Sequence, residues 1–211
     1  MARIGKIIVL LASFVVIANG CSFFSTPTKE ISFYTLEYEV KKTPPPEPLP
    51  VAIRMERFGA APEYNSSRMV YRDAAYNRNS YTYHKWQAKV GDIVYYFMTR
   101  DFAESGFFKA VFTDDTRFPA SYRIGGFVNE FGEWDLEPNW MAVNVVNIIL
   151  FAENEPDVRK RILFQKTYRV EVQVHGKNPL ALVEAMSQAM ATLSGEVIED
   201  VYAAIKKREK L

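Results

Sequence analysis

Cys21 is the side chain with the clearest potential chemistry in this sequence, because it is the only cysteine and follows a long apolar run. Arg3 and Lys6 lie near the start, residues 7–18 are almost wholly apolar, and Gly20 precedes the thiol. A basic start, an apolar core and a small residue before the cleavage point are the features of a secretory signal peptide. A lone cysteine forms no intramolecular disulfide, so we expect its thiol to carry a diacylglycerol through a thioether.

Residues 17–21 resemble the lipobox of bacterial lipoproteins, although Ala18 and Asn19 stand where leucine and a smaller residue are usual. The apolar run has about a dozen residues, whereas a spanning helix needs roughly 20, so we expect cleavage before Cys21 rather than a retained anchor. Ordinary secretory cleavage without acylation is the alternative. Two acyl chains, such as palmitate, anchor a protein stably, at ~0.8 kcal/mol per buried methylene. Ser22 replaces the aspartate of enteric retention signals, so the expected location is the outer membrane, facing the periplasm.

The remaining chain is predicted to be one packed domain on a short tether. Residues 1–20 are the signal peptide, residues 21–30 the acylated N-terminus and tether, and residues 31–211 the domain. A hydrophobic content of 48% and an aromatic content of 14% are typical of a packed globule rather than a disordered chain. Loss of Arg3 and Lys6 with the signal leaves 24 basic against 25 acidic residues, a net charge of −1. This balance gives no overall attraction for nucleic acid.

No catalytic, metal-binding or cofactor-binding constellation is visible in the sequence. His84 and His175 are the only histidines, and acylation occupies the one cysteine, so we predict no zinc site. Asp114 and Asp115 follow a strand between threonines and are read as a solvated turn rather than an acid/base pair. The sequence lacks a G-x-x-x-x-G-K-[ST] phosphate loop and a G-x-S-x-G nucleophile elbow. We therefore expect a protein that is not an enzyme.

Aromatic and basic side chains alternate over residues 71–86, which makes this segment the candidate binding surface. Similar interleaving stacks bases in nucleic-acid proteins, but secretion and the net charge oppose that function. One hypothesis is a partner-docking edge, because Tyr, Trp and Arg are favoured anchors at interfaces. The alternative is ordinary sheet structure, with two tyrosines on one face and the tryptophan buried at the start of a helix. The candidate docking residues are Tyr71, Arg72, Tyr81, Tyr83 and Trp86.

Runs of alternating and β-branched residues predict a sheet interrupted by one helix. Residues 85–105 have apolar positions near helical spacing, and Gly106 is a suitable stop. Residues 44–50 predict an extended proline-rich loop, residues 154–157 a turn, and Gly125 with Gly126 a bulge or bend. The segments at 69–72 and 81–84 pair as a hairpin or line the sheet edge. The other predicted strands cover residues 31–36, 51–58, 107–113, 122–131, 142–151 and 162–174.

The last segment is the most regular helix. Asn178 is a suitable N-cap, and Pro179 suits the first turn. Apolar residues then recur every three or four positions and must cover one face of the sheet, which predicts an α+β single domain with a mainly antiparallel sheet and two principal helices. A face containing methionines also suits adaptable lipid binding, although core packing is the simpler interpretation. The stripe consists of Val183, Met186, Met190, Leu193, Val197, Val201 and Ile205.

The order of these segments resembles the ABC-type transport auxiliary lipoprotein family. The similarity covers residues 33–205 and follows a lipobox. Gln87 departs from the alanine–glutamate pair of many relatives. The motifs that carry the resemblance are Tyr34-Thr-Leu36, the stretch at residues 57–64, Met69-Val-Tyr-Arg72, Tyr81-Thr-Tyr-His-Lys-Trp86 and the closing helix.

The resemblance implies an accessory role in transport. Such a lipoprotein would dock an MCE-domain protein and, through it, an ABC permease and ATPase that move lipid across the bacterial envelope. The outer membrane would hold it through its acyl chains. Two other functions remain open: a periplasm-facing lipid-binding carrier, and a structural envelope lipoprotein that binds peptidoglycan or an outer-membrane protein. The sequence also leaves open whether copies form a homo-oligomer.

Overall fold

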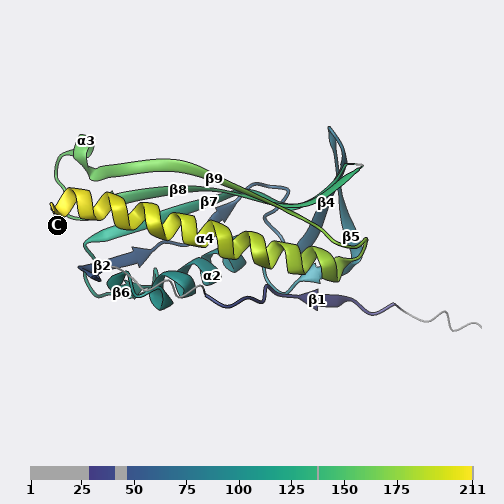
Figure 1. Ribbon diagram of the computed structural model, residues 1–211, viewed down its shortest axis with the longest axis horizontal. Coiled ribbons are helices and arrows are strands. Elements are labelled where there is room, and N and C mark those ends of the chain that lie inside the picture. The colour runs from purple at the N-terminus through teal and green to yellow at the C-terminus, as the bar shows by residue number, and fades with distance from the viewer. Residues whose placement is uncertain (1–28, 41–46, 137, 211) are drawn as a thin grey trace, which may run out of the picture. The chain divides into compact units, whose positions relative to one another are not determined.

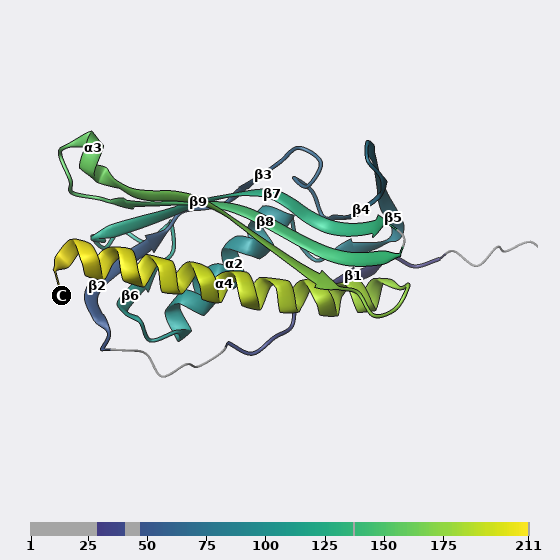
Figure 2. The same cartoon turned by 45° about the horizontal axis from the view of Figure 1, so that its top comes forward.

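One large sheet, with two long helices on one of its faces, forms the unit Ile31–Leu211 (Figures 1 and 2). The structure is a computed structural model that describes residues 29–40, 47–136 and 138–210. The predicted signal peptide, Cys21 and most of the predicted tether lie outside these ranges. Within them the elements are β1 (Ser32–Tyr34), β2 (Leu49–Met55), β3 (Gly59–Ala60), β4 (Arg68–Ala74), β5 (Asn77–Trp86), α2 (Val90–Glu104), β6 (Phe108–Phe112), β7 (Tyr122–Leu136), β8 (Asn139–Ala152), α3 (Val158–Arg161), β9 (Ile162–Gln173) and α4 (Pro179–Glu209).

Strand β7 is the central strand of the sheet, because both of its edges are paired. On one edge β8 runs antiparallel to it over its whole length, and β9 adds to β8 in the same sense. On the other edge β2, β3 and β4 lie one after another, each parallel to β7. The two longest ladders are antiparallel, so the predicted α+β fold, with its mainly antiparallel sheet and single domain, is confirmed.

Helix α4 confirms the predictions made for its cap and its apolar stripe. The Asn178 Oδ1 accepts a hydrogen bond from the Ala181 backbone N–H at 3.0 Å, and Pro179 is the first helical residue. All seven stripe residues are buried against the sheet and α2. Met186 and Met190 have no exposed surface, so they belong to the core, where a buried apolar side chain contributes about 1.5–3 kcal/mol.

Helix α2 begins later than predicted. Trp86 is the last residue of β5 rather than the opening residue of a helix, and α2 starts at Val90. The backbone N–H of Trp86 bonds the carbonyl of Ser67, just before β4, and that of Gln87 bonds the carbonyl of Tyr34 in β1, so neither group is available to a helix that would begin here. The predicted stop is confirmed, because α2 ends at Glu104 and Gly106 adopts a φ of 74°.

The predicted bulge at Gly125 and Gly126 is wrong in position. Both glycines keep regular register with β8, and the irregularity lies between Val128 and Glu130. Gly126 is instead a close-packing position, because a Cβ there would lie 2.3 Å from the Phe58 ring.

Two other predicted boundaries differ from the observed ones. The predicted proline-rich loop lies partly outside the described residues, and β2 already includes Pro50, next to a register shift with β6. The expected 154–157 turn continues into the short helix α3, where the Asp157 carboxylate caps the Arg159 N–H.

The approach of β4 to β7 depends on a glycine. A Cβ at Gly132 would lie 2.6 Å from the Val70 carbonyl oxygen, whereas one at Gly195 in α4 would meet nothing within 4 Å.

We therefore expect Gly132→Ala to lower the free energy of unfolding by about 1–3 kcal/mol, because backbone must move to admit the methyl group. Gly195→Ala is the matched control and should raise it by about 0.5–1 kcal/mol, because alanine favours the helix. Urea unfolding of both variants measures the difference. Equal stability of Gly132→Ala and the parent would contradict the close β4–β7 contact.

Candidate functional site

The structure divides the candidate docking residues between the two faces of the sheet. Tyr71 and Arg72 are adjacent in β4, so their side chains point to opposite faces. Tyr71 pairs with Glu133 of β7 and Arg72 with Trp134. The Glu133 face is the one covered by the helices, and we call the other, Trp134 face the open face.

The helix-side face carries a cluster of half-buried aromatic rings. Tyr71 and Tyr81 have ring centroids 5.2 Å apart, and the His84 ring lies 6.0 Å from Tyr81. The Tyr34 hydroxyl is 3.1 Å from His84 Nδ1. The predicted hairpin, formed by β4 and β5, is confirmed. It is irregular, because three extra residues of β5 lie between the pairs Val70–Ser80 and Arg68–Lys85. Such a bulge re-aims side chains and brings Tyr81 and His84 to one side.

A buried carboxylate fixes this cluster to the central strand. Glu133 is 2% exposed and accepts a hydrogen bond from the Tyr81 hydroxyl at 2.7 Å. Burial raises the pKa of Glu133 more than the bond from Tyr81 lowers it. Burial and then the bond to Glu133 raise the pKa of Tyr81. Tyr71 and Tyr81 therefore act mainly in joining the β4–β5 hairpin to β7.

Trp86 is a core residue, which corrects its inclusion among the docking candidates. It is 1% exposed, and its ring packs edge-on against Phe131 at 5.3 Å between centroids. A partner cannot reach it in this structure. Tyr83 is 41% exposed and remains on the surface of β5.

The open face carries a stacked cluster that we call the Trp134 stack. The guanidinium carbons of Arg72 and Arg169 lie 4.5 and 4.7 Å from the Trp134 ring centroid. Glu130 accepts from the Trp134 indole N–H at 2.5 Å and from Arg169 at 3.3 Å, and Glu171 accepts from Arg169 at 2.6 Å. The stack comprises Arg72, Glu130, Trp134, Arg169 and Glu171.

The bulge in β7 decides which face Trp134 occupies. Before it, Ile124 and Val128 point to the helices and are fully buried. After it the alternation is inverted, so that Phe131 and Glu133 point to the helices and Trp134 to the open face. Simple alternation from Ile124 would place Trp134 in the core, and Arg169 comes from another strand. Of the docking residues predicted from the sequence, only Arg72 belongs to the Trp134 stack.

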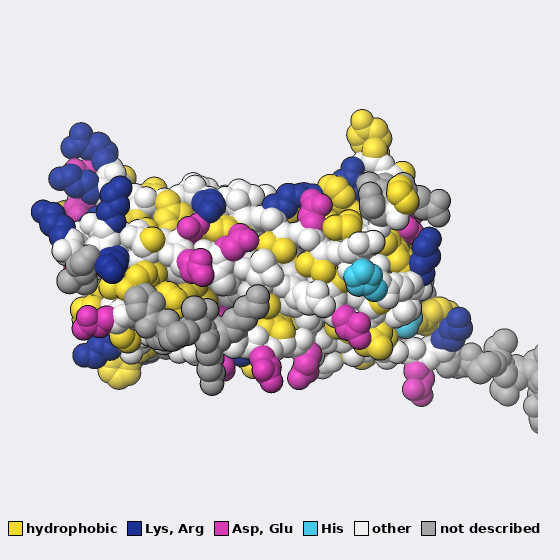
Figure 3. Space-filling view, viewed as in Figure 1, with side chains coloured by type: hydrophobic (Ala, Val, Ile, Leu, Met, Phe, Trp, Pro, Cys, Tyr) yellow, Lys and Arg dark blue, Asp and Glu magenta, His cyan; other side chains and the backbone are white. Residues whose placement is uncertain are grey.

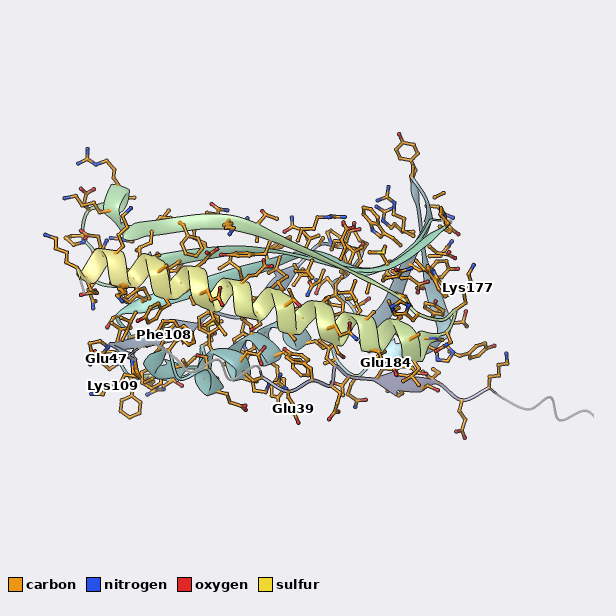
Figure 4. All side chains as sticks on the ribbon, in the orientation of Figure 1. Glu39, Glu47, Phe108, Lys109, Lys177 and Glu184 are labelled. Carbon is orange, nitrogen blue, oxygen red and sulfur yellow. The ribbon has the colours of Figure 1, made fainter. Side chains whose placement is uncertain are left out.

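A small cleft lies between α2, α4 and the segment that follows β1. Its volume is about 200 Å³, below the roughly 300–1,000 Å³ of typical ligand pockets. Asp101 is 2% exposed within it and accepts from the Tyr38 hydroxyl at 2.7 Å and from Arg100 at 2.8 Å. Burial, and then Asp101, raise the pKa of Tyr38. Glu39, labelled in Figure 4, also lines the cleft.

The described residues offer no grouping of three or more His, Cys, Asp or Glu side chains that could hold a metal ion. His84 is engaged with Tyr34. Asp114 and Asp115 lie exposed in a turn, and Asp115 accepts from the Thr113 hydroxyl at 2.6 Å, which confirms the turn prediction. None of the helices in the described ranges is long and apolar enough to cross a bilayer.

Comparison with known proteins places the chain in a family. The sequence profile of the ABC-type transport auxiliary lipoprotein component family matches residues 34–198, most of the chain. The chain belongs to this family. Membership indicates an envelope lipoprotein, anchored to a membrane, that accompanies an ABC transport system. The predicted resemblance is thereby confirmed.

Solved structures show the same fold at low sequence identity. A protein from Xanthomonas campestris is 17% identical, with a TM-score of 0.76 over 85% of this chain and 100% of that one. A hypothetical protein from Chlamydia trachomatis is 9% identical, with a TM-score of 0.50 over 74% of this chain and 98% of that one. No curated protein sequence matches this chain.

The buried Glu133 generates a pH-dependent prediction. Because its pKa is raised in the folded state, ionising it costs stability as the pH rises from the ordinary glutamate range toward neutrality. We expect the stability of the parent relative to Glu133→Gln to fall between about pH 4 and pH 7. Unfolding free energies at both pH values give the difference, with Glu184→Gln, an exposed site on α4 (Figure 4), as the control. If the unfolding free energy of the parent, relative to that of Glu133→Gln, rose with pH, the raised pKa of Glu133 would be contradicted.

Proposed function

We propose that this protein is an outer-membrane lipoprotein, acylated at Cys21, that docks the MCE-domain subunit of an ABC lipid transport system and through it the permease and ATPase. Family membership supports the transport role, and the Trp134 stack supports docking. The lipobox and Ser22 support the outer membrane as the location.

The Trp134 stack is the observation that carries the docking role. Tryptophan and arginine are the residue types most enriched among binding hot spots. Here both arginines are already ordered, because Arg72 also donates to the carbonyls of Ala74 and Ala75 at 3.3 Å and Arg169 is paired with two glutamates. A partner that binds an ordered side chain loses less conformational entropy than one that must order it.

The open face is accessible, because both long helices lie on the other side of the sheet within the described residues (Figure 2). Along the rest of this face the described side chains are mixed. Asn147 bonds Thr167 and Gln165 at 3.0 Å each, Arg123 at the far end of β7 bonds Glu56 at 2.9 Å, and Phe127 is 44% exposed. Beside the indole itself lie the charged side chains of the stack, and an aromatic centre with a polar rim is the usual composition of a protein interface.

The cleft between α2 and α4 does not favour the lipid-carrier alternative. At about 200 Å³ it is smaller than typical pockets for drug-sized ligands, and a phospholipid is larger still. A structural envelope lipoprotein remains the competing function, and partner capture separates the two.

We expect Trp134→Ala to weaken capture of the MCE-domain subunit roughly 30-fold or more, as for a binding hot spot. Arg72→Gln should also weaken capture, although it leaves the Trp134 indole in place. Tyr96→Ala is the matched control, because Tyr96 is 62% exposed on α2. Crosslinked pull-down of the acylated protein, with the melting temperature of each variant, measures the effect. Equal capture by all three variants would contradict docking at the stack.

The anchor has its own test. Cys21→Ser should abolish palmitate incorporation and release the protein into the soluble periplasmic fraction, because the hydroxyl does not take the thioether-linked lipid. Ser22→Asp keeps the thiol and should move the acylated protein to the inner-membrane fraction. Metabolic labelling with palmitate followed by density-gradient fractionation measures the acylation and the membrane location of both variants. A Cys21→Ser protein that stays in the outer membrane would contradict lipid anchoring.

A further inference from the structure

Exposed apolar side chains gather at the end of the domain where the chain enters it. Ile31 and Phe33 of the β1 segment are 44% and 56% exposed, and Tyr83 on the neighbouring β5 is 41% exposed. Tyr76, at the β4–β5 turn, is fully exposed. We call this set, Ile31, Phe33, Tyr76 and Tyr83, the β1-end patch.

The patch belongs to one end of the fold. β1 pairs with β5, with Phe33 opposite Lys85, so Phe33 and Tyr83 lie on adjacent strands; Ile31 directly precedes β1, and Tyr76 lies in the turn before β5. Figures 1 and 2 both place β1, the β4–β5 hairpin and the start of α4 at the same end, opposite α3 and the C-terminus. In Figure 3 hydrophobic side chains project from the hairpin tip at this end, with basic side chains beside the sheet.

Chain length keeps this end close to the anchoring membrane. Ile31 follows Cys21 by ten positions, and this length of chain, fully extended, spans at most about 35 Å. α4 starts at this end and, with 31 residues, runs about 46 Å toward the other. Acylation of Cys21 would therefore keep Ile31 within about 35 Å of the bilayer, whereas the tether sets no such limit on the α3 end.

We propose that the β1-end patch lies against the bilayer that holds the acyl chains of Cys21, with its aromatic rings at headgroup level. This inference rests on the acylation in the proposed function. It adds a second, non-covalent contact that orients the domain on the membrane.

The composition of the patch suits a lipid surface. Tyrosine is enriched at membrane–water interfaces because its ring is apolar and its hydroxyl remains hydrated. Arg78, exposed beside the hairpin turn, and Lys177, which precedes α4 (Figure 4) and lies over the Trp140 ring, supply cations at the same end. Long basic side chains reach headgroup phosphates while their stems cover apolar surface. The Trp134 stack, on the part of β7 that pairs with β4, would then hold the partner near the bilayer surface.

Site-specific quenching in vesicles tests the orientation. Acylated protein carrying Tyr83→Cys or Phe33→Cys is labelled with a fluorophore, since acylation leaves the new cysteine as the only free thiol. It is then reconstituted into vesicles of phosphatidylethanolamine and phosphatidylglycerol. The control is Ile162→Cys, because Ile162 is 49% exposed at the opposite end. On vesicles, labels at positions 33 and 83 should lose most of their quenching by aqueous iodide and gain quenching by a lipid-borne nitroxide, while the label at 162 should not change.

Three other outcomes would overturn the inference, and flotation separates their causes. Protein that floats with the vesicles but shows equal quenching at 83 and 162 is anchored and not oriented, so only this inference fails. Protection at 83 that requires added MCE-domain subunit would make the patch a protein interface. Protein that does not float, and whose Cys21 takes the fluorophore, is not acylated, and the proposed anchor fails with it.

Discussion

The backbone ladder of β7 is the constraint on which the rest of the structure depends. A single strand is paired with β8 along one edge and with β2, β3 and β4 in succession along the other, so segments distant in sequence are held in one register. The bulge between Val128 and Glu130 then inverts which side chains face the helices. That one-residue irregularity places the buried Glu133 beside the half-buried aromatic cluster and Trp134 on the open face.

The placement of the helices determines where binding is available. α2 and α4 cover one face, and their buried residues, together with Trp86 and the methionines of α4, form the core. The open face is left with polar pairs and the Trp134 stack, and the β1 end with exposed aromatic rings. Under the proposed function, the open face takes the partner and the β1 end meets the membrane, while the buried sides of the two helices belong to the core.

The sequence predicted those features whose causes are local. The cap at Asn178, the apolar stripe of α4, the stop at Gly106 and the turn at Asp114 each depend on neighbouring residues, and each is confirmed. The predicted start of α2 is wrong because the backbone N–H groups of Trp86 and Gln87 bond the carbonyls of Ser67 and Tyr34, far away in sequence, in place of a helical turn. Of the Trp134 stack only Arg72 was predicted. The stack depends on a bulge and on three strands, and neither leaves a periodic signal in the sequence.

Photo-crosslinking in intact cells tests docking through the open face most directly. A photoreactive amino acid at position 173 samples that face without altering the stack, because Gln173 is exposed and pairs with Met141, which pairs with Trp134. One at position 96 samples exposed α2 on the helix side. Docking at the Trp134 stack predicts that position 173 captures an MCE-domain subunit and position 96 does not. Capture of that subunit from position 96 alone, or of peptidoglycan-bound or outer-membrane protein from position 173, would contradict it.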